Sequence, residues 1–61
     1  MPGNKEGRGQ SDRDEGLAKA IDRAWDNAKE NGAQPGDTLT IQQIQIVGNN
    51  PIHTYIVIVG P

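Results

Sequence analysis

The sequence predicts an α+β fold in which one amphipathic helix packs on an antiparallel β-hairpin. Apolar residues recur at helical spacing between Leu17 and Ala28, which is typical of a helix with one apolar stripe. Two runs rich in β-branched residues, at 37–47 and 52–59, flank a turn sequence at 48–51. A chain of 61 residues without cysteine is short for a self-sufficient core, so we expect homo-oligomerisation to complete the α-β-β fold.

Residues 1–10 are predicted to form a flexible tail ahead of a single helix-plus-hairpin domain at 11–61. The tail segment contains three glycines and a proline, and Met1 is its only large apolar side chain. Burial cannot then offset the entropy that is lost when the segment becomes ordered. Lys5, Arg8 and Arg13 could form a basic docking arm, but so few dispersed cations make a weak field. We favour a solubilising tail.

The helix is predicted to begin near Ser11 and to end at Asn31 and Gly32. Ser11 and Asp14 fit an imperfect capping box, and the acidic residues that follow Ser11 suit the positive end of the helix dipole. Gly32 readily accepts the left-handed backbone conformation that ends many helices. Trp25 lies on the apolar stripe, where it could stack on an aromatic ligand, but we expect it to pack in the core or an interface.

The first strand, at 37–47, changes the phase of its alternation at Gln42 and Gln43. Under strict alternation Leu39 and Ile41 fall on one face, whereas Ile44 and Ile46 fall on the other. A β-bulge at Gln42-Gln43 would return all of them to one face. A straight strand would instead cover two different apolar surfaces along its length. We favour the bulge.

The second strand, at 52–59, is apolar on both faces. Ile56 and Ile58 point one way, whereas Tyr55, Val57 and Val59 point the other. One short helix covers one face, most simply that of Ile56 and Ile58. Exposure of the other face would leave an apolar patch on a sheet with open edges. We therefore predict that Tyr55, Val57 and Val59 form the interface of a homo-oligomer.

Composition and residue inventory point away from catalysis. The chain has one histidine, His53, and no cysteine, so we expect no enzyme activity, no catalytic residue and no metal site. Gln43, Gln45 and Tyr55 are the candidate ligand-binding residues, because copies from several subunits could line a polar cavity that holds a small molecule. The formal charge of −2 is too mild to indicate nucleic acid or an anionic membrane as a partner. No apolar run has the length of a membrane span, and the first residues lack a signal-peptide core, so we expect a cytoplasmic protein.

The order of helix, strand and strand resembles that of the dodecin-like proteins over residues 17–59. The likeness rests on an Ala-Ile-x-x-Ala motif at Ala20, an Ile-x-x-Tyr motif at Ile52 and three segments: 17–24 (LAKAIDRA), 39–44 (LTIQQI) and 52–59 (IHTYIVIV). Dodecins are small oligomeric shells with hairpins inside and helices outside, and many bind flavin or another small ligand. They begin with a strand before the helix, and their flavin-stacking Trp lies near the start of the next strand. This chain has Asp-Thr-Leu there, so the resemblance implies a homo-oligomer but assigns no cofactor and no flavin-binding residue.

The residues and the resemblance together predict a non-enzymatic homo-oligomeric assembly protein of dodecin-like character. Its partner would be itself, and a small ligand could be bound or stored between subunits. The alternative is a protein–protein interaction module that docks a different partner through an exposed strand face or edge.

Overall fold

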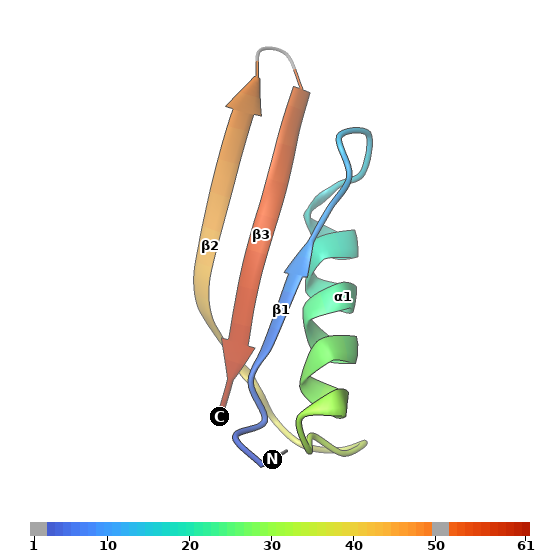
Figure 1. The fold of residues 1–61 in the computed structure, drawn as a ribbon, viewed down its shortest axis with the longest axis vertical. Helices are drawn as coiled ribbons and strands as arrows, with labels where there is room; N and C mark the ends of the chain where they lie inside the picture. Colours follow the sequence, from blue (N-terminus) through green and yellow to red (C-terminus); the bar gives the residue numbers. More distant parts are fainter. Residues whose placement is uncertain (1–2, 50–51) are drawn as a thin grey trace.

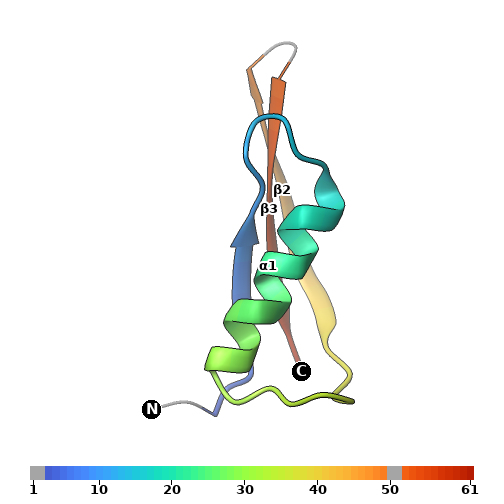
Figure 2. The same cartoon turned by 90° about the vertical axis from the view of Figure 1, so that its right-hand side faces the viewer.

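The computed structural model describes residues 3–49 and 52–61, which form one helix and one three-stranded sheet. The elements are β1 (Gly7–Gln10), α1 (Leu17–Glu30), β2 (Thr40–Asn49) and β3 (Ile52–Gly60). The strands are antiparallel in the order β1-β3-β2, and α1 lies on one face of the sheet (Figures 1 and 2). The predicted α+β class is confirmed. Asn50 and Pro51 of the predicted turn, and Met1 and Pro2 of the predicted tail, lie outside the described residues.

The prediction of a flexible tail is wrong for Gly7–Gln10, which form strand β1 and pair with β3. Gly7 and Gly9 face the helix, and both are buried. A Cβ on Gly7 would overlap the Ala24 carbonyl oxygen and would lie 2.9 Å from the Ala28 Cβ, closer than real Cβ atoms approach. The glycines that suggested disorder are therefore the residues that let the backbone of β1 contact the backbone of α1.

The helix begins at Leu17, several residues later than predicted, and its N-cap is Gly16 without a side-chain hydrogen bond. Ser11 is not a helix cap. It follows β1 and is 1% exposed, and its hydroxyl accepts a hydrogen bond from the Tyr55 N–H at 2.9 Å. The predicted end of the helix is confirmed, because Asn31 is the C-cap and Gly32 has φ +105°.

The core consists of small side chains between α1 and the sheet. Its buried apolar residues are Ala20, Ala24, Ala28, Ala33, Val57 and Val59. Three of the alanines repeat every four residues along α1, so they form one flat stripe that lets the helix lie close to β1 and β3. Larger apolar side chains pack around this centre and are only partly buried: Leu17, Ile21, Trp25, Leu39 and Tyr55.

The predicted assignment of the two faces of β3 is the reverse of the observed one. We expected α1 to cover Ile56 and Ile58, but it covers the face of Val57 and Val59, which are 0% and 5% exposed. The reason is the register with β1, which pairs Gly9 with Val57 and thereby puts that face next to the helix. The prediction that Val57 and Val59 form an oligomer interface is therefore wrong, since the protein's own helix buries them.

The predicted β-bulge in β2 is confirmed. Ile41 pairs with Val59 and Gln43 pairs with Ile58, so Gln42 is the extra residue. After the bulge, Ile44 pairs with Val57 on the face that carries Val59. Ile41, before the bulge, and Ile44 and Ile46, after it, therefore share the helix side of the sheet. In the described part of the chain, no helix is long and apolar enough to cross a membrane.

Candidate functional site: the exposed strand β2

Strand β2 is exposed along its whole described length, although several of its side chains are large and apolar. All side chains described from 40 to 48 are exposed. The most apolar of them are Ile41 (43%), Ile44 (45%), Ile46 (64%) and Val47 (49%). Isolated exposed aliphatic residues are common on soluble proteins, but Ile41, Ile44 and Ile46 share the helix side of the sheet and form a continuous surface of the kind that marks an interaction site. Val47 pairs with Thr54 and adds an exposed aliphatic side chain on the opposite face.

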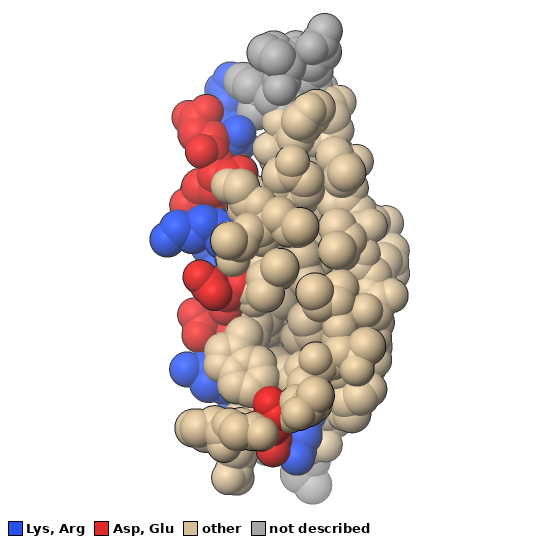
Figure 3. All heavy atoms as spheres, turned by 180° about the vertical axis from the view of Figure 1, so that it is seen from behind, with Lys and Arg blue, Asp and Glu red and all other residues tan. Residues whose placement is uncertain are grey.

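The position of the helix explains this exposure. Helix α1 lies over β1 and β3, and none of its Cα atoms comes within 8 Å of a described Cα atom of β2. Ile44 and Ile46 therefore project on the helix side of the sheet without a helix above them. Figure 3 shows the result, because the charged side chains gather along the helix edge while the broad surface over the strands beside it is uncharged. Residues 38–61 contain no Lys, Arg, Asp or Glu.

The opposite face of the sheet has an apolar centre and a polar rim. Its centre is formed by Ile56 and Ile58 of β3, which are half-buried. Gln43 and Gln45 of β2 lie directly beside them, at Cα register positions 43↔58 and 45↔56. On the other side of β3, the register places Arg8 and Gln10 of β1 on the same face; directly paired residues share a face of the sheet.

The structure does not bring the three predicted ligand-binding residues together. Gln43 and Gln45 point away from the helix, whereas Tyr55 pairs with Ile46 and lies on the helix side. The Tyr55 ring is half-buried and packs against the core, so it is part of the fold of one chain. The two glutamines remain exposed and remain available to a ligand or to another chain.

The opposite edge of the sheet, at β1, is covered by side chains from α1. The Asn27 Oδ1 accepts a hydrogen bond from the Arg8 N–H at 2.9 Å, and the Asn31 Nδ2 donates to the Glu6 carbonyl oxygen at 2.6 Å. The Arg23 guanidinium donates to the Gln10 carbonyl oxygen at 3.0 Å. The side chains from the helix are four residues apart, and their backbone partners along the strand are two residues apart. Four residues of α-helix and two residues of β-strand advance by nearly the same distance, so the same kind of contact repeats.

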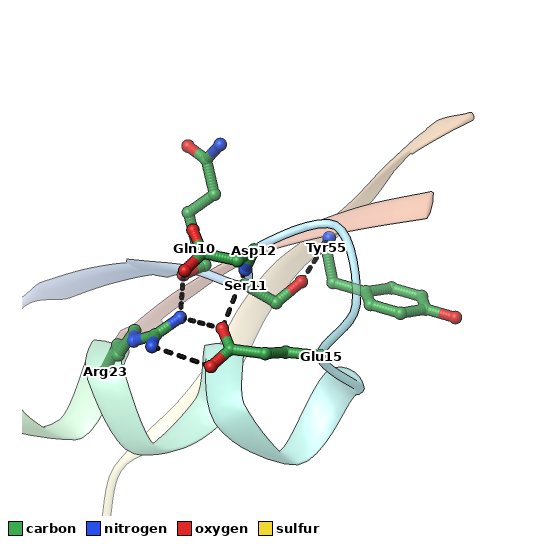
Figure 4. A network of polar contacts seen from close by, with 6 residues as sticks. All are labelled: Gln10, Ser11, Asp12, Glu15, Arg23 and Tyr55. Atoms are coloured by element: carbon green, nitrogen blue, oxygen red, sulfur yellow. Dashed lines mark hydrogen bonds and ion pairs between the residues drawn. The ribbon is translucent and has the colours of Figure 1, made fainter. Parts of the chain in front are cut away.

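A second set of polar contacts holds the loop between β1 and α1 (Figure 4). Arg23 forms a two-pronged ion pair with Glu15, whose Oε1 also accepts a hydrogen bond from the Asp12 N–H at 2.8 Å. The hydrogen bond from Arg23, followed by that from Asp12, lowers the pKa of the Glu15 carboxyl. Ser11 and Tyr55 extend the β1–β3 pairing by one position, since the Ser11 N–H also donates to the Tyr55 carbonyl oxygen at 2.9 Å. These contacts fix β1 against both α1 and β3.

A shallow, open pocket of about 230 Å³ lies beside the covered β1 edge. Its lining includes Asn4, Glu6, Arg8, Asn27 and Asn31, most of which already hydrogen-bond within the chain. None of the three predicted ligand-binding residues lines this pocket. Within residues 3–49 and 52–61, no three His, Asp or Glu side chains gather to hold a metal ion.

The fold and the site define a small α+β protein whose edge strand presents an apolar surface. Comparison of the chain with protein-family models, curated proteins and solved structures found no match. The dodecin-like resemblance therefore stays a prediction.

Proposed function

We propose that the protein is a non-enzymatic homo-oligomeric assembly protein of dodecin-like character. The observation that carries the proposal is the exposure of Ile41, Ile44, Ile46 and Val47 on one uncharged strand. A second copy is the partner with the best match, because an uncharged surface meets its own copy without like-charge repulsion. The presence of β1 supports the dodecin-like character, since dodecins begin with a strand before the helix.

The free energy gained by burying apolar side chains limits how much this surface can contribute to association. Completing the burial of a half-exposed Ile or Val is worth about 1 kcal/mol, so the eight such side chains of a pair of copies contribute about 8 kcal/mol. Association costs roughly 4–15 kcal/mol in lost freedom of motion. Burial of the β2 side chains alone therefore gives a weak pair at best. A stable oligomer requires further contacts, and the backbone groups at the edge of β2 are the nearest source.

A small ligand would be held between subunits on the face that carries Gln43 and Gln45. Their amides both donate and accept hydrogen bonds, and Ile56 and Ile58 provide an apolar floor between them and β1. In this proposal the ligand site forms only in the oligomer, since the face is open in one chain. Absorbing or fluorescent material that purifies with the oligomer and is lost in a Gln45→Ala variant would support ligand storage.

The native mass in solution tests the assembly proposal directly. We expect the parent chain to sediment as a multiple of 6.6 kDa at micromolar concentration. Ile44→Lys should shift the protein to the monomer, because it places a charge in the apolar surface. Ala18→Lys adds the same charge at an exposed position on α1 and should keep the parent mass. A parent chain that sediments only at 6.6 kDa would contradict the proposal and would favour docking to a different protein.

A further inference from the structure

The hydrogen bonds between Ser11 and Tyr55 show which backbone groups of the sheet face which neighbour. Ser11 bonds to Tyr55, so Tyr55 directs its N–H and C=O toward β1. Alternate residues of an antiparallel strand face opposite sides. Thr54, Ile56 and Ile58 therefore face β2, and their register partners there are Val47, Gln45 and Gln43. The residues between those partners, Ile44, Ile46 and Gly48, direct their N–H and C=O groups toward the free edge.

Resting on the homo-oligomer proposed above, we propose that two copies pair edge to edge through β2, antiparallel, with Ile46 on the two-fold axis. The ladder without register shifts begins at Gln43, because the bulge at Gln42 interrupts it on one side. The strand ends at Asn49 on the other side. Only a register centred on Ile46 then uses all three outward residues, pairing Ile44 with Gly48 of the second copy and Ile46 with itself. A register centred on Ile44 would include the bulge residue Gln42 in the ladder.

This pairing joins the favourable features of the edge. It brings together the side chains of Ile46, which at 64% is the most exposed of the large hydrophobic residues, and it adds backbone hydrogen bonds to the apolar burial. Strand β2 contains no Lys, Arg, Asp or Glu, which are the usual protection of an edge against pairing. The product is one continuous six-stranded sheet with the two copies of β1 at its ends.

The covered β1 edge limits the growth of that sheet. Asn31, Asn27 and Arg23 already bond the Glu6 C=O, the Arg8 N–H and the Gln10 C=O, respectively, so these three groups cannot pair with a further copy. The side chains that make these bonds also stand where a further strand would have to lie. The same chain therefore has one edge, β2, that can pair with a copy, and one edge, β1, that is blocked by side chains from the helix. Edge pairing ends at two chains instead of extending into a fibre.

Amide hydrogen exchange of the unmodified protein tests the pairing. Above the dissociation constant, the amides of Ile44, Ile46 and Gly48 should exchange at least about tenfold more slowly than in the diluted monomer, because exchange then requires the pair to open. The amides of Gln43, Gln45 and Val47 are the internal control, since they already bond β3. An oligomer by mass whose Ile44 and Ile46 amides stay unprotected would overturn the edge pairing while the proposed assembly stands; a monomer would remove the assembly itself.

Single cysteines test the register, because the chain has none of its own. The Ile46→Cys copies would have Cα atoms about 5.5 Å apart, within the range of a disulfide. The Val47→Cys copies would be about 8 Å apart, which is too far. We expect Ile46→Cys to cross-link at least about tenfold faster under mild oxidation, the ratio expected when only one pair is pre-aligned. Equal rates would overturn the position of the axis.

Asn27 tests the closed edge. Asn27→Ala frees the Arg8 N–H, and we expect larger species than the parent oligomer in sedimentation as the concentration rises. Asn27→Asp keeps an acceptor oxygen at the same place and should keep the parent mass. Circular dichroism of both variants checks that the fold is intact. If folded Asn27→Ala keeps the parent mass at every concentration, Asn27 does not close the edge.

Discussion

The two edges of the sheet differ in their contacts with the helix. At β1, side chains from the helix and its C-cap bond three outward backbone groups, and helix alanines lie against strand glycines. At β2, which is more than twice as long, no described Cα atom of the helix lies within 8 Å of a strand Cα atom. Stability of the single chain therefore depends on the β1 side, whereas the capacity to bind another chain belongs to the β2 side.

Replacing a glycine of β1 should have the largest effect and would break the β1 side. In Gly9→Ala the new methyl group would overlap the Ala20 carbonyl oxygen and would lie 2.7 Å from the Arg23 carbonyl carbon. Because both are backbone atoms that cannot turn aside, we expect a loss of about 3 kcal/mol or more in the free energy of unfolding. Urea unfolding followed by Trp25 fluorescence measures it.

Gly16→Ala is the matched control for that variant. Gly16 has φ −93°, and a Cβ there would meet no atom within 4 Å. The loss should stay below about 1 kcal/mol, which is the scale of a less favourable N-cap residue. Equal losses in the two variants would mean that close approach of β1 to α1 is not what the glycine provides.

A pair of valine variants sharpens the contrast between the covered and the uncovered parts of the sheet. Val57 is 0% exposed and Val47 is 49% exposed. Val57→Ala should cost about 2 kcal/mol, from lost burial and the cavity that remains, whereas Val47→Ala should cost less than about 0.5 kcal/mol in the monomer. Thermal unfolding at a concentration too low for association measures both. Similar losses would argue against the observed assignment of faces.

Ser11 tests the point where β1 leaves the sheet. Ser11→Ala removes the acceptor of the Tyr55 N–H in a buried place, and we expect a loss of about 1–2 kcal/mol. Thr38→Ala, which removes an exposed hydroxyl, should change stability by less than about 0.5 kcal/mol. Faster hydrogen exchange at Tyr55 in the Ser11 variant alone would locate the effect, and unchanged exchange there would contradict the assigned hydrogen bond.

Acid should weaken the β1 side slightly, through Glu15. The Arg23 and Asp12 hydrogen bonds lower the folded-state pKa of Glu15 below its unfolded value. The resulting stabilisation is complete above the unfolded pKa and is lost as the pH falls through the folded pKa. Glu15→Gln cannot titrate, so the stability difference between parent and variant should be largest near neutral pH and should shrink in acid. A difference that does not change with pH would contradict this account.

The helix stop, the hairpin and the bulge could be predicted because each has a local signal. Gly32 marks the helix end, and the change of phase at Gln42-Gln43 marks the bulge. The local pattern predicts too early a helix start, because the acidic residues that suggest a cap belong to the preceding loop, where Glu15 binds Arg23 across eight residues of sequence. The sequence spacing that marks helix caps does not reveal such a contact.

Local sequence patterns did not predict strand β1, nor which face of β3 the helix covers. Gly7 and Gly9 have the composition of a linker, and only the alanines of α1 give them a structural role. The spacing of Ala20, Ala24 and Ala28 was available as a signal, since small residues every four positions predict close packing against another backbone. The large residues of the helix stripe, Leu17, Ile21 and Trp25, are only partly buried around these alanines and do not indicate which face of β3 the helix covers.

The bulge at Gln42 makes the length of β2 as important as its composition. Removal of this one residue would restore an uninterrupted ladder with β3, and every side chain on one side of the deletion would change to the other face of the sheet. No side chain would change its chemistry, yet Ile41 could not stay beside Val59 while Ile44 stays beside Val57. Deletions and insertions between Ile41 and Gln43 are therefore a greater threat to this strand than most substitutions.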